Sequence, residues 1–496
     1  MDNPNKPNVG TRALGLIKRY PGYFTACVAT GAMSVASTQG WTSAVPMNIN
    51  PVIAFVVAFP FGILGWAAIK AFLLGKPKPK EKELLRGARL ADARDLQKQT
   101  AKLTGAKPMR VAGVGIPREI EPQHFLLAGA PGTGKSLTIA EMLRAVRDRG
   151  ERAIVIDPAG EFRREYAESG DTVLNPFIQG AADWSIFAEM RGPWDAERLA
   201  RSIIPDGKSG QQEEWNHYSQ KLVAAVLQAL QKAGRDNNYD FTHKLLNADN
   251  AELAMLVADH PAAQIFAKGA DRMAASVRAI IGTYLSAYST LPPPAGASAF
   301  SIKTWVESGS GWLWIPFAGD QRDALKPLAA CWLDIAIQGL MALPPDRERR
   351  VWFMLDELPA LGRVQSLQKL TAECRKFGGV AVAGLQSVSQ LREVYGRDGA
   401  QSMMATFGSW LILRAGDAET ADYLSKHLGE SEIKRTVHSG STRGNQSSST
   451  ASDQYAKEMA VMASEIMSLP DRAGYLSLAG NYPTAKVGVP LPGKGK

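Results

Sequence analysis

The 496-residue sequence predicts an α/β protein with a parallel sheet, an inserted all-α domain and an N-terminal two-helix transmembrane hairpin. Three observations support this fold class. Short apolar runs alternate with helical stretches from His124 onward, which is the pattern of a parallel sheet covered on both faces. Long amphipathic helical patterns interrupt this alternation between Asp183 and Ser298. No charged residue or histidine occurs from Tyr20 to Ile69, and soluble proteins rarely contain so long an uncharged segment.

The uncharged segment is long enough for two passes through a bilayer, because a helix needs about 20 apolar residues to cross its core. The second pass, Val52–Leu74, is the more apolar, and the first, near Tyr23–Thr38, is rich in small residues. Lys and Arg residues flank the pair on its outer sides, whereas the connection 39–51 has none. The positive-inside rule therefore predicts that both termini are cytoplasmic. A cleaved signal peptide is the alternative for the first segment.

The composition divides the chain into five segments. They are the transmembrane hairpin at 1–75, a basic juxtamembrane stalk or linker at 76–110, the two parts of the α/β domain at 111–182 and 299–496, and the inserted all-α domain at 183–298. The stalk is charged and helix-prone as far as Leu103. Near the C-terminus, the Ser/Thr/Gly-rich segment Thr436–Asp453 is typical of a loop. The following segment, Val461–Val489, is expected to form a final helix and strand.

Residues Gly129–Ser136 read GAPGTGKS and match the phosphate-binding loop pattern G-x-x-x-x-G-K-[ST]. The string follows an apolar run and precedes a helical stretch, which is the context that this loop requires. Its glycines let backbone N–H groups face phosphate oxygens, and the helix N-terminus adds partial positive charge. Lys135 is expected to reach the β- and γ-phosphates, and the Ser136 hydroxyl to ligate Mg²⁺. The predicted contacts of ATP and Mg²⁺ are Gly129, Ala130, Pro131, Gly132, Thr133, Gly134, Lys135, Ser136 and Leu137.

Two further apolar runs end in groups that suit hydrolysis of a nucleotide. Val351–Leu355 precedes Asp356 and Glu357; Asp356 is expected to hold the Mg²⁺ and Glu357 to orient the attacking water. The alternative is an acidic helix cap. Val380–Ala383 leads to Gln386, which either senses the γ-phosphate or forms a turn.

Other polar residues are weaker candidates. Asp157 and Glu161 follow the apolar run Ala153–Ile156, at the edge of the sheet where ligands bind; they are minor candidates, and a structural role is the alternative. Arg375 and Lys376 precede the strand that leads to Gln386. They could present a cation to the nucleotide of a neighbouring subunit, or form an ordinary basic helix end. Trp215, in the all-α domain, is either a core residue or, if subunits enclose a channel, an aromatic residue that faces it.

Taken in order, these features resemble the coupling proteins of conjugative type IV secretion systems, the TraD/TrwB-like membrane ATPases. The resemblance covers nearly the whole chain. It consists of the two N-terminal passes, GAPGTGKS, DPAGEF at Asp157–Phe162, the helical insertion, LDELP at Leu355–Pro359, ECRKFG at Glu373–Gly378 and GLQS at Gly384–Ser387. Each string is modestly specific, but LDELP followed about thirty residues later by GLQS is a strong combined signature.

The resemblance implies a RecA-like motor domain, a homo-hexameric ring at the bacterial inner membrane, and single-stranded DNA carrying a relaxase as cargo. Secretion-channel proteins are further expected partners, and Arg375 matches the proposed arginine finger of the family. A net charge of +9 is compatible with sequence-independent contacts to DNA phosphates.

Composition and motifs exclude several other classes. A hydrophobic content of 45% is too high for a disordered protein, and three widely spaced cysteines form neither a disulfide scaffold nor a zinc cluster. The H-E-x-x-H pattern of zinc proteases does not occur. Two alternatives to a DNA pump remain: a duplex-DNA translocase of the chromosome-segregation type, and an ATP-regulated docking receptor that does not pump.

Overall fold

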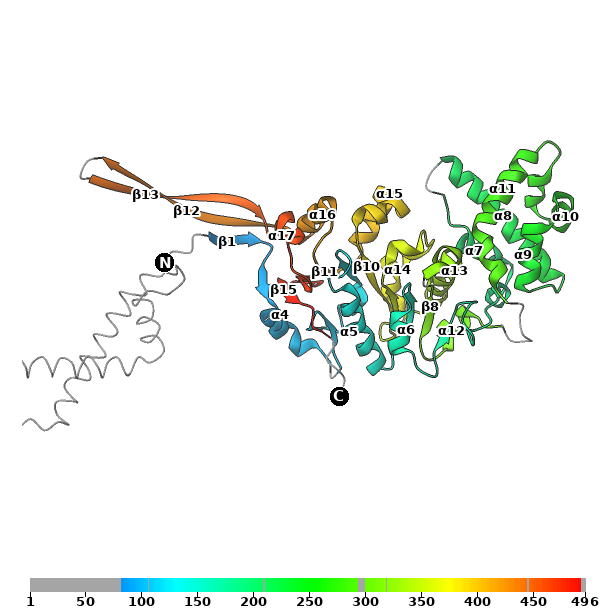
Figure 1. Cartoon of the computed structure of the whole chain (residues 1–496), viewed down its shortest axis with the longest axis horizontal. Helices are drawn as coiled ribbons and strands as arrows, with labels where there is room; N and C mark the ends of the chain where they lie inside the picture. Colours follow the sequence, from blue (N-terminus) through cyan, green and yellow to red (C-terminus); the bar gives the residue numbers. More distant parts are fainter. Residues whose placement is uncertain are drawn as a thin grey trace, which may run out of the picture. The chain divides into compact units, whose positions relative to one another are not determined.

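The computed structural model describes residues 82–491 apart from 106, 208–209, 293–298, 318 and 444–445 (Figure 1). The predicted transmembrane hairpin lies outside the described residues. The chain forms two compact units, of which the larger comprises Leu84–Ile433 and Ala456–Lys496. The smaller includes Lys434–Tyr455.

The larger unit is built on a ten-stranded sheet in the order β2-β15-β14-β11-β5-β10-β9-β6-β8-β7. Its strands are β2 (Leu90–Asp92), β5 (Phe125–Ala128), β6 (Arg152–Asp157), β7 (Thr172–Val173), β8 (Leu313–Pro316), β9 (Val351–Leu355), β10 (Gly379–Leu385), β11 (Ser409–Ile412), β14 (Ala473–Ser477) and β15 (Thr484–Gly488). All strands from β11 to β7 are parallel, whereas β14 is antiparallel to both β11 and β15. The four apolar runs found in the sequence are β5, β10, β9 and β6, which lie side by side.

Both faces of the sheet are buried, because alternate residues of each strand contact different helices. On β9, Trp352 and Met354 belong to a core with α5 (Lys135–Asp148), while Phe353 and Leu355 belong to a core with α13 (Arg322–Met341). The first face also carries α4 (Ala93–Thr100), α6 (Glu161–Tyr166) and a small sheet of β3 (Met109–Val111) and β4 (Val114–Ile116). The second face carries α12 (Ile302–Ser308), α14 (Leu367–Glu373), α15 (Val388–Ala405), α16 (Ala418–Leu428) and α17 (Ala463–Met467).

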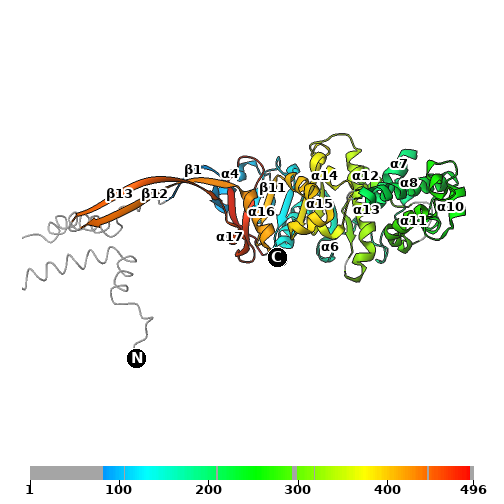
Figure 2. The same cartoon turned by 90° about the horizontal axis from the view of Figure 1, so that it is seen from above.

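The chain between β7 and α12 is helical, as the sequence predicts. It contains α7 (Pro193–Ile203), α8 (Gly210–Lys232), α9 (Asn238–Asn247), α10 (Asn250–Leu256) and α11 (Asp271–Leu285). These helices gather at the end of the larger unit opposite α4 in both views (Figure 1, Figure 2). Within the described residues, one helical stretch, Gly319–Met341, is long and apolar enough to cross a membrane. Most of it is buried between the sheet and α7, so its composition is that of a core helix.

Three expectations about the ends of the chain are wrong. The predicted stalk helix begins instead with two strands, β1 (Lys82–Gly87) and β2, and β2 joins the main sheet by pairing with β15. The predicted loop at Thr436–Asp453 is part of two long strands, β12 (Glu430–Arg443) and β13 (Gln446–Met459), which form a sheet with β1. The final segment contains a helix and two strands rather than one. Composition alone could not reveal the pairings of β1 with β12 and of β2 with β15, because they join segments from opposite ends of the described chain.

Candidate nucleotide-binding site

The phosphate-binding loop connects β5 to α5 and is fixed to the two neighbouring strands. The Gly129 N–H donates to Leu385 O (3.0 Å), and the Ala130 N–H donates to Arg414 O (2.7 Å). Gly132 and Gly134 have φ angles of 75° and 113°, in the left-handed region that favours glycine. These contacts place the loop at the carboxyl edge of the sheet, where ligands bind in such folds.

Lys135 begins α5 and extends over the loop. Its Nζ donates to Gly129 O (2.6 Å) and Ala130 O (3.0 Å), and the residue is 7% exposed. Burial lowers the pKa of Lys135, while the nearby carboxylates of Asp356 and Glu357 oppose that shift. The loop therefore holds a poorly solvated cation at the position where a phosphate-binding loop meets the β- and γ-phosphates.

Ser136 and Asp356 come together from different elements. The Ser136 hydroxyl at the start of α5 donates to Asp356 Oδ1 (3.2 Å), immediately after β9. Burial above all, together with the neighbouring Asp157 and Glu357 carboxylates, raises the pKa of Asp356 to about 6, although the Ser136 hydrogen bond and Lys135 act in the opposite direction. A hydroxyl and a carboxylate are oxygen ligands of the kind that Mg²⁺ prefers. The pair therefore fits a magnesium ion, which would neutralise charge on the phosphates.

Gln386, after β10, donates its Nε2–H to Glu357 Oε1 (3.0 Å). Both side chains face the same cavity of about 270 Å³ as Lys135. The cavity is lined by Pro131, Gly132, Gly134, Lys135, Ser136, Leu137, Asp356, Glu357 and Gln386. The predicted residues Gly129, Ala130 and Thr133 support the loop without lining this cavity; the Thr133 hydroxyl, for example, donates to Ala130 O (2.7 Å).

Two supporting residues were missed by the sequence analysis. Gly384 in β10 lies against β9, so a Cβ there would lie 1.8 Å from Asp356 O. Arg472, before β14, donates its backbone N–H to Thr133 O (3.0 Å). The GLQS string contained Gly384, but only the strand order shows that the absence of a side chain at this position lets the Asp356 carbonyl approach closely. No local signal marked Arg472.

Arg375 does not join the cavity. It lies in a 3₁₀ turn, Cys374–Phe377, immediately before β10, whereas the cavity lies after the ends of β5, β9 and β10. Because these strands are parallel, Arg375 is at the opposite edge of the sheet. Its side chain is exposed and forms no ion pair with another described residue. The Lys376 ammonium lies 4.9 Å from the centre of the Phe377 ring.

The contacts of the remaining candidates, Asp157, Glu161 and Trp215, are with the protein's own backbone and core rather than with the cavity. Asp157 is 1% exposed and accepts a hydrogen bond from the Arg163 N–H (2.9 Å); burial raises its pKa. Glu161 is exposed in the first turn of α6. Trp215 on α8 is half-buried against the core, with its ring centre 6.0 Å from that of Tyr218. Hydrogen bonding accounts for the buried Asp157 carboxylate, and packing accounts for the Trp215 ring, without a ligand at either residue.

A sequence profile described as the type IV secretion-system coupling protein DNA-binding domain matches residues 108–490. The chain belongs to this family. Coupling protein TraD of Escherichia coli (strain K12) is 29% identical over 465 residues, covering 91% of this chain and 63% of TraD. A conjugal transfer protein TraG of Escherichia coli is 26% identical over 360 residues, covering 63% of this chain and 56% of TraG. This coupling protein thus spans about three fifths of the length of these relatives.

Solved structures of a bacterial conjugative coupling protein, TrwB, have the same fold. An unbound form lacking N-terminal residues, TrwBdeltaN70, matches with a TM-score of 0.77 and 34% identity, over 84% of this chain and 96% of that chain. TrwB with the non-hydrolysable ATP analogue ADPNP matches with a TM-score of 0.76 and 33% identity, over 84% and 96%. TrwB with ADP and Mg²⁺ matches with a TM-score of 0.75 and 33% identity, over 84% and 95%. The RecA-like α/β fold with an all-α domain and the family resemblance are confirmed.

Proposed function

We propose that this coupling protein is a membrane-anchored, DNA-dependent ATPase. It couples ATP hydrolysis to the recruitment and pumping of single-stranded DNA bearing a relaxase into a type IV secretion channel during bacterial conjugation. The observation that carries the proposal is the convergence of Lys135, the Ser136–Asp356 pair and the Glu357–Gln386 pair on one cavity.

Each residue has a distinct role in the proposed hydrolysis. Lys135 neutralises charge on the β- and γ-phosphates, and Ser136 and Asp356 hold the Mg²⁺. Glu357 orients water and accepts its proton. Gln386, which is hydrogen-bonded to Glu357, contacts the γ-phosphate, and loss of that phosphate shifts Gln386 and the end of β10. The TrwB complexes with ADPNP and with ADP and Mg²⁺ support these ligands, because TrwB has the same fold and binds them.

We propose that Arg375 completes the site of a neighbouring subunit. Within one chain it lies at the opposite edge of the sheet from the cavity, so it cannot act on its own nucleotide without a large rearrangement. An exposed guanidinium supplied across an interface is how an arginine finger acts in trans. This arrangement requires a ring, and a homo-hexamer is the form that the family resemblance implies.

We place the protein at the bacterial inner membrane, crossing it twice, with both termini and the bulk of the chain in the cytoplasm. The uncharged segment from Tyr20 to Ile69 and its basic flanks support this topology. A relaxase and components of the secretion channel are the proposed protein partners.

The experiment is an ATPase assay on the full chain in detergent, with and without single-stranded or duplex DNA. We expect single-stranded DNA to stimulate turnover more than duplex DNA and Lys135→Thr to abolish turnover. ATPase activity that is indifferent to DNA would favour the docking receptor, and stronger stimulation by duplex DNA would favour the chromosome-type translocase.

A further inference from the structure

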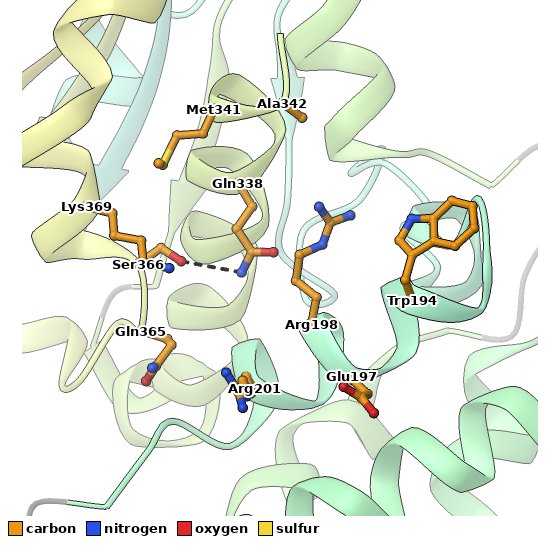
Figure 3. A pocket seen from close by; sticks show the side chains of 10 residues that line it. All are labelled: Trp194, Glu197, Arg198, Arg201, Gln338, Met341, Ala342, Gln365, Ser366 and Lys369. Carbon is orange, nitrogen blue, oxygen red and sulfur yellow. Dashed lines mark hydrogen bonds between the residues drawn. The ribbon is translucent and has the colours of Figure 1, made fainter.

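A second cavity of about 460 Å³ lies between the helical domain and the α/β domain. Figure 3 shows its walls: α7, the last turns of α13 and the segment Gln365–Lys369. No residue of the nucleotide-binding cavity lines it. It is therefore a separate site.

The cavity is positively charged. Its lining contains Arg198, Arg201 and Lys369 but only one acidic residue, Glu197. Arg198 forms an ion pair with the buried Asp195. Arg201 and Lys369 are exposed, and neither forms an ion pair with another described residue. Two cations are thus left for a ligand that carries negative charge.

An exposed aromatic ring stands beside these cations. Trp194 is 71% exposed, although large aromatic side chains are usually well buried. Its indole lies against Gly192, so that a Cβ at Gly192 would be 2.4 Å from the ring. The backbone thus supports one part of the indole and leaves the rest open. Cations beside an open aromatic surface are the combination that binds single-stranded nucleic acids.

The floor of the cavity is a buried hydrogen-bond network. Asp334 on α13 is 0% exposed and accepts hydrogen bonds from Ser202 Oγ on α7 (2.5 Å) and from the Ser366 N–H (2.5 Å). Gln338 donates to Asp334, to Ser202 and, as drawn in Figure 3, to Ser366 Oγ (3.4 Å). This network fastens the helical domain to the segment that precedes α14.

A second contact fastens the same two parts. The Asp206 N–H donates to Gln365 Oε1 (3.0 Å), and Gln365 Nε2 donates to Asp206 Oδ2 (2.6 Å). Because α7 and the segment around Gln365 are joined at two places, a ligand held between Arg201 and Lys369 would act on both together.

The segment that carries Lys369 also links the residues proposed to act in hydrolysis. The chain leaves β9 through Asp356 and Glu357, passes the cavity at Gln365–Lys369, and reaches Arg375 before β10 begins. One continuous segment therefore contains the Mg²⁺-binding carboxylate, the cavity wall and the proposed arginine finger.

We propose that this cavity binds the phosphodiester backbone of the transported DNA strand, with Arg201 and Lys369 on the phosphates and Trp194 stacked on a base. The proposal rests on the proposed DNA-dependent function and names the residues at which DNA binds. DNA held here biases the segment from Asp356 to Arg375, and in this way stimulates hydrolysis.

The experiment measures binding of fluorescein-labelled single-stranded DNA to the full chain at several salt concentrations. The variant Arg201→Gln/Lys369→Gln is compared with Lys221→Gln/Arg272→Gln, which removes two exposed cations of the helical domain that do not line the cavity. Loss of two phosphate contacts should raise Kd about 25-fold near 0.1 M salt and reduce its log–log salt slope by about 1.4. The DNA concentration for half-maximal ATPase stimulation should rise by the same factor, and the control variant should match the wild type.

A second variant tests the aromatic contact. Trp194→Ala should weaken binding about fivefold or more, and Trp194→Phe should restore most of it, because stacking needs only an aromatic face.

Several results would overturn the proposal. One is an unchanged Kd and salt slope for DNA in Arg201→Gln/Lys369→Gln, and another is an equal loss of DNA affinity in the control variant. A third concerns poly-glutamate, used as an acidic polypeptide probe: Arg201→Gln/Lys369→Gln loses affinity for poly-glutamate but keeps its affinity for DNA. The last result would assign the cavity to an acidic protein segment. A wild-type chain that binds no single-stranded DNA would overturn the proposed function as well, whereas wild-type binding with an unaffected variant overturns the cavity alone.

Discussion

Substitution of Gly384 by alanine is predicted to lower ATP turnover by displacing the backbone that carries Asp356 in the candidate nucleotide site. A Cβ at this position would lie 1.8 Å from Asp356 O, and real Cβ atoms are essentially never closer than 3.0 Å to another heavy atom. The nearest atom is backbone rather than a flexible side chain, so β9 and β10 must separate by more than an ångström.

That displacement has two measurable consequences. Forcing an extra methyl group into a packed core costs about 1–3 kcal/mol of stability. Moving Asp356 and Glu357 by about 1 Å should lower ATP turnover roughly 100-fold. The substitution itself removes none of the polar groups that line the cavity.

The assay pairs urea unfolding with ATPase turnover on the full chain, and Gly282→Ala is the matched control. Gly282 is in α11, and a Cβ there meets no heavy atom within 4 Å. The control should keep wild-type turnover and gain about 0.5–1 kcal/mol of stability. Turnover within twofold of wild type in Gly384→Ala, together with an unchanged unfolding midpoint, would show that the strands accommodate the extra methyl group without moving Asp356.

Two further predictions concern His124 and Arg375. His124 is 2% exposed and its Nδ1 accepts the Ala381 N–H (3.0 Å); burial lowers its pKa to about 4 from 6.5. Because the unfolded chain binds this proton at higher pH, the stability from His124 is complete above about pH 6.5 and falls by roughly 3 kcal/mol towards pH 4. Urea unfolding across that range should show a flatter pH dependence in His124→Gln, and an identical dependence contradicts this prediction. Arg375→Ala should bind nucleotide normally and lose about 1,000-fold in turnover, whereas Lys376→Ala should not. Mixing Arg375→Ala with Lys135→Thr chains should restore part of the activity if the finger acts in trans, and a mixture as inactive as either variant contradicts that role.

The grouping of the candidate nucleotide-binding residues around one cavity was largely predictable from the sequence, because these residues follow the ends of predicted parallel strands. Lys135, Asp356, Glu357 and Gln386 come after β5, β9 and β10, and parallel strands bring their carboxyl ends to one edge. The four central strands were equally clear, since each contains a short, wholly apolar run.

The features that escaped prediction depend on pairings between distant segments. The strand β2 pairs with β15 from the other end of the chain, and a charged segment such as 82–92 gives no sign of that partner. Gly384 could not be understood without knowing that β10 lies next to β9. The second cavity depends on the contacts of Asp334 with Ser202 and Ser366, and a lone Asp in an apolar helix does not reveal its partners.

The proposed function requires that ATP turnover at this site drives DNA transfer. Transfer of a mobilisable plasmid from a donor strain whose transfer system depends on this chain tests that requirement, by comparing wild type with Lys135→Thr. Membrane fractions from both strains confirm that the protein is present in equal amounts. We expect transfer from the Lys135→Thr donor to fall to the level of a donor lacking the chain. Transfer at the wild-type level, with the variant protein in the membrane, would contradict it.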